Sequence, residues 1–404
     1  MRLKIYSFIL FLNSFITGLI IPVLSLLLMD KGATLSTISL IMGFYAFTVI
    51  AFELPSGIMA DLMGRKKTFC LSLIFSLLFS FIILFGRGFW VLCIALVING
   101  LGRAISSGAF EALFIDSYIN ENGKDKLHLV TTRINVLDAL GLSAGALIGG
   151  LFPEISKTYF SSLGVYDLNI IIKIIFTVLL IIMSLVYIKE TLIIEKNKRI
   201  TLNQHIKNSF KIVVDSKNIV LIFISVFSTG FLISSLETYW QPHLVSLINK
   251  DSLLILLGIT AFLYFGAAMT GNIFSGKLLN KINAVKMYIF LRIILAFTVI
   301  IMALQTNVFS FIIFYSLLYL IFGMANIPEG VILNKETPNE ARASILSIYS
   351  LTAQIGALCG SFINSVIINY ISISKLWILG SIVIIITIMV ISKKLSFNSE
   401  NCIS

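Results

Sequence analysis

The 404-residue chain has a mean hydropathy of +1.01, with 58% hydrophobic and 12% charged residues. A soluble globule needs a far more polar surface than this composition provides, so we expect a polytopic membrane protein. The formal net charge of +11 would suit a nucleic-acid partner only if the bases formed one face. Because they fall between apolar segments instead, we expect no nucleic-acid partner.

Apolar segments of about 20 residues, the length that crosses a bilayer as a helix, recur along the whole chain. We predict twelve such spans and hence an all-α membrane protein. The first follows Arg2 and Lys4, and it is too long for the apolar core of a signal peptide, so we expect a retained helix. The predicted spans cover residues 5–29, 37–60, 68–86, 90–114, 130–151, 168–188, 218–240, 253–275, 285–304, 308–330, 343–370 and 375–392.

The connections between these spans carry their lysines and arginines unevenly. Of the 30 Lys and Arg residues, 22 fall on one side of the predicted membrane and 5 on the other, and Arg103, Lys173 and Arg292 lie inside spans. Because basic residues stay in the cytoplasm, this bias predicts that both termini are cytoplasmic, and we expect the protein in the plasma membrane. We call the predicted cytoplasmic side of the membrane inner and the opposite side outer.

The longest polar segment, residues 189–217, separates the spans six and six. It predicts an N-terminal bundle at 1–188, a cytoplasmic linker at 189–217, a C-terminal bundle at 218–394 and a cytoplasmic tail at 395–404. A shift of 215 residues places Gly141 and Gly145 on Gly356 and Gly360. Repeated halves of this kind are typical of secondary transporters, and we expect two pseudo-symmetric six-helix bundles.

A short charged hairpin is predicted between the second and third spans. Its pattern is Gly57-x-x-x-Asp61-x-x-Gly64-Arg65-Lys66. This spacing resembles the loop signature of the major facilitator superfamily, which lies between the same two transmembrane helices.

The resemblance implies a conformational latch between the two halves. In the family the loop acid faces the N-terminus of helix 11, and the loop arginine pairs with an acid at the inner end of helix 4. Carried over, Asp61 would cap the helix that begins near Ala341, where exposed amides favour a negative charge, and Arg65 would pair with Asp116. The implied latch residues are Gly57, Asp61, Gly64, Arg65, Lys66, Asp116 and Arg342.

Other stretches are similar to a branch of bacterial exporters within that family. They are the runs 52–61 and 106–116, the tripeptide Trp240-Gln241-Pro242, and the run 342–347. A stripe of small residues in the fifth span resembles the antiporter signature of the family, with Ala146 where the pattern has proline. Its glycines, which would let two helices approach closely, are Gly141, Gly145, Gly149 and Gly150.

Charges inside the spans are the candidates for function, because each costs about 2.5–3.5 kcal/mol at the centre of a helix unless it has a partner or water. Arg103 lies roughly 18 Å from the outer end of the fourth span, and Asp138 roughly 12 Å from the inner end of the fifth. Their similar depth on consecutive helices suggests that they pair or share a water-filled cavity. Asp138 could then carry a coupling proton, the alternative being a static ion pair.

Four further charges lie within or near the ends of spans. Glu53 precedes Pro55, and it suits a gate or proton site, or else a partner of the basic hairpin. Glu237 suits either the central cavity or the outer interface beside Trp240. Glu329 and Arg292, in the inner thirds of their spans, are further candidates for the cavity.

No Ser-His-Asp or metal-ligand pattern and no Gly-x-x-x-x-Gly-Lys phosphate loop occurs in the sequence, so we expect neither an enzyme nor a cofactor nor a metal. We predict a secondary active transporter that works by alternating access, most simply a proton-coupled exporter of small amphipathic or lipophilic compounds. The alternatives are a metabolite or nutrient symporter of the same fold and, more remotely, a membrane enzyme or a sensor. The expected partners are substrate, protons and lipid, for a monomer.

Overall fold

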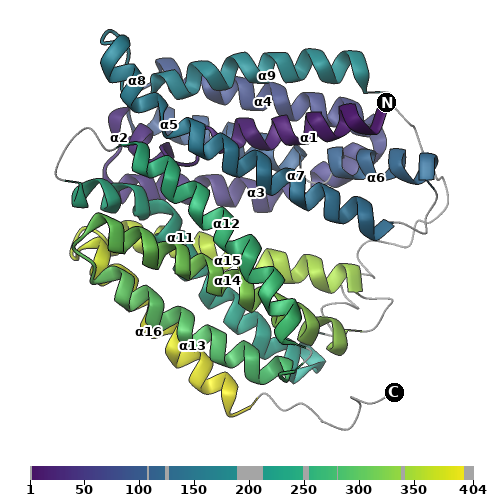
Figure 1. Ribbon diagram of the computed structural model, residues 1–404, viewed down its shortest axis with the longest axis vertical. Helices are drawn as coiled ribbons and strands as arrows, with labels where there is room; N and C mark the ends of the chain where they lie inside the picture. Colours follow the sequence, from purple (N-terminus) through teal and green to yellow (C-terminus); the bar gives the residue numbers. More distant parts are fainter. Residues whose placement is uncertain are drawn as a thin grey trace. The chain divides into compact units, whose positions relative to one another are not determined.

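A computed structural model describes residues 2–106, 109–122, 127–188, 213–248, 254–279, 281–337 and 342–394. These residues form fifteen helices, and no strand occurs among them (Figure 1). The helices are α1 (Arg2–Gly18), α2 (Leu24–Asp30), α3 (Leu35–Met63), α4 (Arg65–Phe85), α5 (Phe89–Ser106), α6 (Ala109–Asn122), α7 (Leu127–Gly149), α8 (Phe152–Tyr159), α9 (Asp167–Tyr187), α11 (Lys217–Leu247), α12 (Ile255–Leu278), α13 (Ala284–Ala303), α14 (Val308–Glu336), α15 (Arg342–Ile367) and α16 (Ile373–Ser392).

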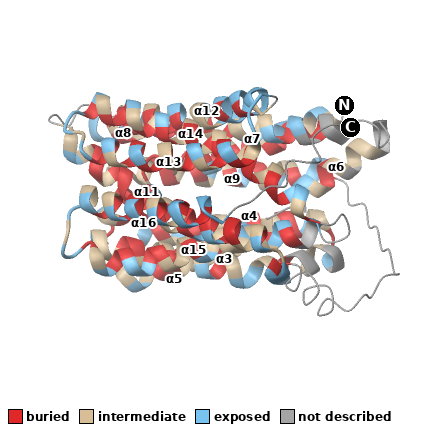
Figure 2. Ribbon diagram, turned by 90° about the horizontal axis from the view of Figure 1, so that it is seen from below, coloured by how far each residue is buried: buried red, intermediate tan, exposed pale blue. Residues whose placement is uncertain are grey.

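The all-α membrane fold predicted from the sequence is confirmed. Eleven stretches of helix in the described chain are long and apolar enough to cross a membrane, and the shorter apolar helix Leu3–Gly18 lies where the first predicted span begins. α9 shows why these helices need lipid. Its small and polar residues Lys173, Thr177 and Ser184 are buried, whereas Ile175, Ile182 and other apolar residues at helical spacing point outward. Figure 2 shows exposed residues along the outward sides of the helices.

The first predicted span is not one helix. α1 ends at Gly18 and α2 begins at Leu24, and the residues between them form tighter turns in which Ile21 N donates to Gly18 O and Val23 N to Ile20 O. Pro22 explains the break, because it lacks an N–H and its ring crowds the preceding turn of a helix.

The predicted charged hairpin is wrong in its extent. α3 continues to Met63 and α4 begins at Arg65, so Gly64 alone joins them. Gly64 has φ of +94°, a conformation that residues with a Cβ rarely adopt. Pro55 lies inside α3 without ending it.

Contacts divide the chain into two compact units. The first comprises Met1–Ile194 and Thr238–Gly266, and the second comprises Glu195–Glu237 and Ala267–Ser404. The outer ends of α11 and α12 therefore belong to the first unit. The sequence predicted different boundaries, at residues 188, 217 and 394, between the two bundles, the linker and the tail. These boundaries stay a prediction.

Within the first unit, α1 packs against α7 and α9, and α4 against α5 and α9 (Figure 1). The α1–α7 contact is made by the glycine stripe, since a Cβ at Gly141 or Gly145 would overlap the α1 backbone and one at Gly149 would overlap Leu19 just after α1. Asn169 of α9 donates to Leu19 O and Gly149 O at 2.9 and 2.7 Å, which satisfies carbonyls at the ends of both helices.

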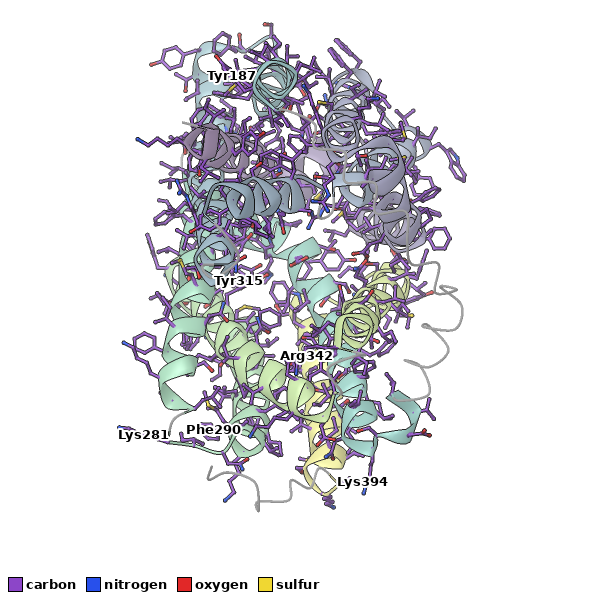
Figure 3. The ribbon with its side chains drawn as sticks, turned by 90° about the vertical axis from the view of Figure 1, so that its right-hand side faces the viewer. Tyr187, Lys281, Phe290, Tyr315, Arg342 and Lys394 are labelled. Atoms are coloured by element: carbon purple, nitrogen blue, oxygen red, sulfur yellow. The ribbon has the colours of Figure 1, made fainter. Side chains whose placement is uncertain are left out.

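The second unit repeats this packing. A Cβ at Gly356 would overlap the backbone at Phe227, and one at Gly360 would overlap Phe231 and Ser234, so α15 lies against α11 as α7 lies against α1. The glycine pairs matched by the sequence shift thus make equivalent contacts in the two halves. Figure 3 looks onto the helix ends of this unit that carry Lys281, Arg342 and Lys394.

A buried ion pair ties together three outer connections of the first unit. Lys31 Nζ lies 2.7 Å from Asp167 Oδ1, and the two side chains are only 3% and 13% exposed. Lys31 also donates to Leu84 O at 3.2 Å, and its own carbonyl accepts from Gly88 N at 2.9 Å. The connections α2–α3, α4–α5 and α8–α9 therefore meet at one lysine.

We predict that Lys31→Met lowers the thermal midpoint of the purified protein by several degrees. The substitution leaves Asp167 without its cation, and breaking a buried pair costs on the order of 3 kcal/mol. Thermal unfolding followed by intrinsic fluorescence in detergent tests this. Lys157→Met, on the exposed face of α8, is the matched control, and equal midpoints for the two variants would contradict the role of the pair.

Candidate transport site

Three charged residues from neighbouring helices share one space in the first unit. Arg103 ends α5, Glu111 begins α6 and Asp138 lies in the middle of α7. Glu111 lies close enough to the other two to interact electrostatically with both, and all three side chains are exposed. Charges within a span need a partner or water, so we expect water to reach these side chains.

Asp138 is also held by the first helix, because Ser14 Oγ of α1 donates to its Oδ1 at 2.5 Å. No direct ion pair joins Asp138 to Arg103 within the described residues. The ion pair expected as one alternative is therefore not observed among these residues, and the shared water-filled cavity stays a prediction.

Glu111 was missed by the sequence reasoning, although a signal was present. It falls inside the predicted span 90–114, three residues from its inner end, and a charge within a span is a candidate for function. The sequence analysis assigns the run 106–116 only to the resemblance to exporters, and its set of charges within spans omits Glu111.

Glu53 lies on α3 and is partly exposed. Next to it, Ser56 Oγ donates to Glu53 O at 2.8 Å and to Ala104 O at 2.7 Å, which ties α3 to α5 one residue beyond Arg103. A gating or proton role for Glu53 stays a prediction.

Glu237 lies deeper in the second unit than the sequence predicted. The seventh span was expected to end at residue 240, but α11 continues to Leu247, which leaves Glu237 about 15 Å from the end of the helix. Its side chain is exposed, and it interacts electrostatically with Tyr319 of α14. Snorkelling to the outer interface therefore explains Glu237 less well than a position in an aqueous cavity.

An aromatic row on α14 flanks this acid. The ring centroids of Tyr315 and Tyr319 are 5.2 Å apart, and those of Tyr319 and Phe322 are 6.3 Å apart. Figure 3 labels Tyr315. Carboxylate and aromatic faces side by side are the groups that bind organic cations.

Arg292 and Glu329 differ from the other candidates because both are buried, at 2% and 1% exposure, in direct ion-pair contact. Arg292 also lies over the Tyr288 ring, 5.3 Å from its centroid, and Tyr288 donates its hydroxyl proton to Ser225 Oγ at 2.6 Å. Tyr349 of α15 interacts with Glu329. One polar cluster thus joins α11, α13, α14 and α15.

The residues of the implied latch are only partly described. The side chains of Gly57, Asp61 and Asp116 lie outside the described residues, so the contacts expected of Asp61 and Arg65 stay predictions. Lys66 Nζ donates to Leu185 O at 2.8 Å, a favourable place for a cation at the end of α9. Arg342 begins α15 with its side chain exposed.

Comparison with known proteins decides the family. The profile of the Major Facilitator Superfamily matches residues 6–326 and 245–396. The chain belongs to the Major Facilitator Superfamily. This is the family that the charged hairpin predicted.

Curated relatives in the superfamily are moderately similar. The chain is 29% identical over 235 residues to the uncharacterized MFS-type transporter YxaM of Bacillus subtilis, covering 57% of this chain and 55% of YxaM. It is 26% identical over 268 residues to the quinolone resistance protein NorA of Staphylococcus aureus, covering 64% of each. The chain thus matches less than two thirds of the length of either relative.

Solved structures share the fold of this superfamily member at low identity. The nucleoside transporter NupG superposes with a TM-score of 0.82 at 14% identity, covering 98% of this chain and all of NupG. A bacterial homologue of the human lysosomal transporter Spinster gives 0.71 at 12% identity, covering 97% and 94%. At these identities the likeness concerns the fold alone.

We predict that Glu329→Met destabilises the protein strongly and that adding Arg292→Met restores most of the loss. The single change leaves a buried guanidinium unpaired, which costs about 3–5 kcal/mol, whereas replacing both partners with apolar side chains is often close to neutral. Thermal midpoints of the two variants in detergent measure this. A double variant no more stable than the single one would contradict a chiefly structural pair.

Proposed function

We propose that this transporter exports small amphipathic or lipophilic compounds across the plasma membrane in exchange for protons, by alternating access. The observation that carries the proposal is the group of exposed charges within spans, Arg103, Glu111 and Asp138. Membrane proteins retain such costly groups on ion and substrate pathways. The similarity to NorA, whose name refers to quinolone resistance, supports export of such compounds.

The two acids provide a place for a proton. Glu111 and Asp138 interact as like charges, which disfavours the state in which both are ionised, while Arg103 favours an ionised carboxylate. Because α5, α6 and α7 carry one charge each, a shift of any of these helices would change the distances among the three charges.

Glu237 and its aromatic neighbours favour a cationic or neutral substrate. An exposed carboxylate attracts a cation, and the faces of Tyr319 and Phe322 suit an apolar or aromatic body. A small anion would gain nothing from either group. We place the substrate contact of the second unit here and assign Glu329 to the structural cluster.

The remaining features of the proposal follow the sequence. The Asp61 and Arg65 latch would hold the halves together at the inner side, both termini would lie in the cytoplasm, and the monomer would be the transporting unit. A metabolite or nutrient symporter on the same fold is the alternative, and the direction of proton movement separates it from an exporter.

We predict that lipophilic cations drive proton movement in proteoliposomes that hold the purified protein, and that Asp138→Asn reduces this flux at least tenfold. The asparagine keeps an acceptor for Ser14 but cannot release a proton. A trapped pH dye reports the flux under an imposed pH gradient, over a panel of lipophilic cations and neutral drugs.

Asp215→Asn is the matched control for this assay, because Asp215 is exposed next to the inner start of α11 and belongs to no charge cluster described above. It should transport as the wild type does. Full flux in Asp138→Asn would place the coupling proton elsewhere, and silence of the wild type across the panel would contradict export of lipophilic drugs.

A further inference from the structure

The break in the first span removes one backbone hydrogen bond that a continuous helix would make. In an unbroken helix Ser25 N would donate to Ile21 O, four residues earlier. Here the side chain of Gln241 stands between them. Ser25 N donates to Gln241 Oε1 at 2.8 Å, and Gln241 Nε2 donates to Ile21 O at 2.7 Å. One amide therefore replaces both partners of the missing bond.

The outer end of α11 makes two more bonds to the same region. Ser25 Oγ donates to Thr238 O at 2.8 Å, and the Tyr239 hydroxyl donates to Leu35 O, at the start of α3, at 3.1 Å. Gln241 and Ser25 are each 3% exposed, and Tyr239 is fully buried. A buried amide with both ends bonded to backbone is specific for its site, because any other side chain would leave these two groups unpaired.

α11 itself crosses from one compact unit to the other. Residues up to Glu237 belong to the second unit, whereas Thr238 and the residues that follow belong to the first. Gln241 therefore lies close to the point where α11 passes from the second unit to the first. The contacts of α12 also change from one unit to the other along its length, and close to its outer end Gly258 packs on Gly150, the residue just after α7.

We propose that Gln241 is the outer latch of the transport cycle, a removable rung that completes the first span only while the outer side is closed. The proposal rests on the proposed alternating-access function. When the outer end of α11 leaves, water reaches Ile21 O and Ser25 N and satisfies them, so the break tolerates both states. Because an amide carries no charge, the latch does not titrate, and the proton acts at other residues.

The latch predicts that Gln241→Met opens the outer side more often. Methionine keeps the length of the side chain but makes neither bond. Ala261, which is buried one turn beyond Gly258 on α12, becomes the reporter as Ala261→Cys in a chain whose native Cys70, Cys93, Cys359 and Cys402 are alanine. We expect a membrane-impermeant maleimide added from outside to label it roughly tenfold faster, as the loss of two neutral hydrogen bonds implies.

Gln305→Met is the matched control. Gln305 lies just beyond the outer end of α13, and its side chain donates to Ile301 O of that helix, so its substitution should leave labelling unchanged. Ser25→Ala removes one bond and keeps Gln241, and it should raise the rate by a smaller factor. This variant still decides the question if Gln241→Met does not fold.

Labelling of Gln241→Met and Ser25→Ala within twofold of the wild type would overturn the latch. The assay needs no substrate and no proton gradient, so its failure differs from failure of the proposed function. A protein that labels as predicted but moves no protons would keep the latch and lose proton coupling. One that transports normally but shows no change in labelling would lose the latch alone.

Discussion

Every polar group within the apolar core of a bilayer needs a partner inside the protein or a path to water. This constraint governs where the chain departs from regular helix. At the break near Pro22, the Gln241 amide hydrogen-bonds the two backbone groups that the helix leaves unpaired. In the same way, Asn169 donates to the carbonyls of Leu19 and Gly149. Side chains from distant parts of the sequence thus replace backbone partners, and the irregular places become the places where helices are tied to one another.

The same constraint sorts the charged residues within spans into two classes. Arg292 and Glu329 are buried against each other and against tyrosines, so their charges are neutralised within the protein. Arg103, Glu111, Asp138 and Glu237 are exposed, and at their depth only water is compatible with that exposure. We propose that the second class exchanges protons and contacts substrate, whereas the first joins four helices of the second unit.

The sequence predicted the fold well because its signals are strong and local. Spans of about 20 apolar residues, the bias of basic residues and the repeated glycines each follow from bilayer physics. The site was predicted less completely. Whether Glu329 is paired or Glu237 faces water depends on neighbours far away in sequence, and the true length of α11 moved Glu237 from the interface to the interior. Likewise, nothing in the neighbouring sequence predicts that Gly64 alone connects α3 to α4, or that Gln241 bonds the backbone at the break in the first span.

The most direct test of this account asks which intramembrane carboxylates water can reach. The purified protein would be treated in detergent with a hydrophilic carbodiimide and a small amine, and the modified acids located by peptide mass spectrometry. The account predicts coupling at Glu111, Asp138 and Glu237 and protection of Glu329. Protection of the first three acids, or modification of Glu329 to the same extent, would contradict the division into water-facing and buried charges on which the proposed function depends.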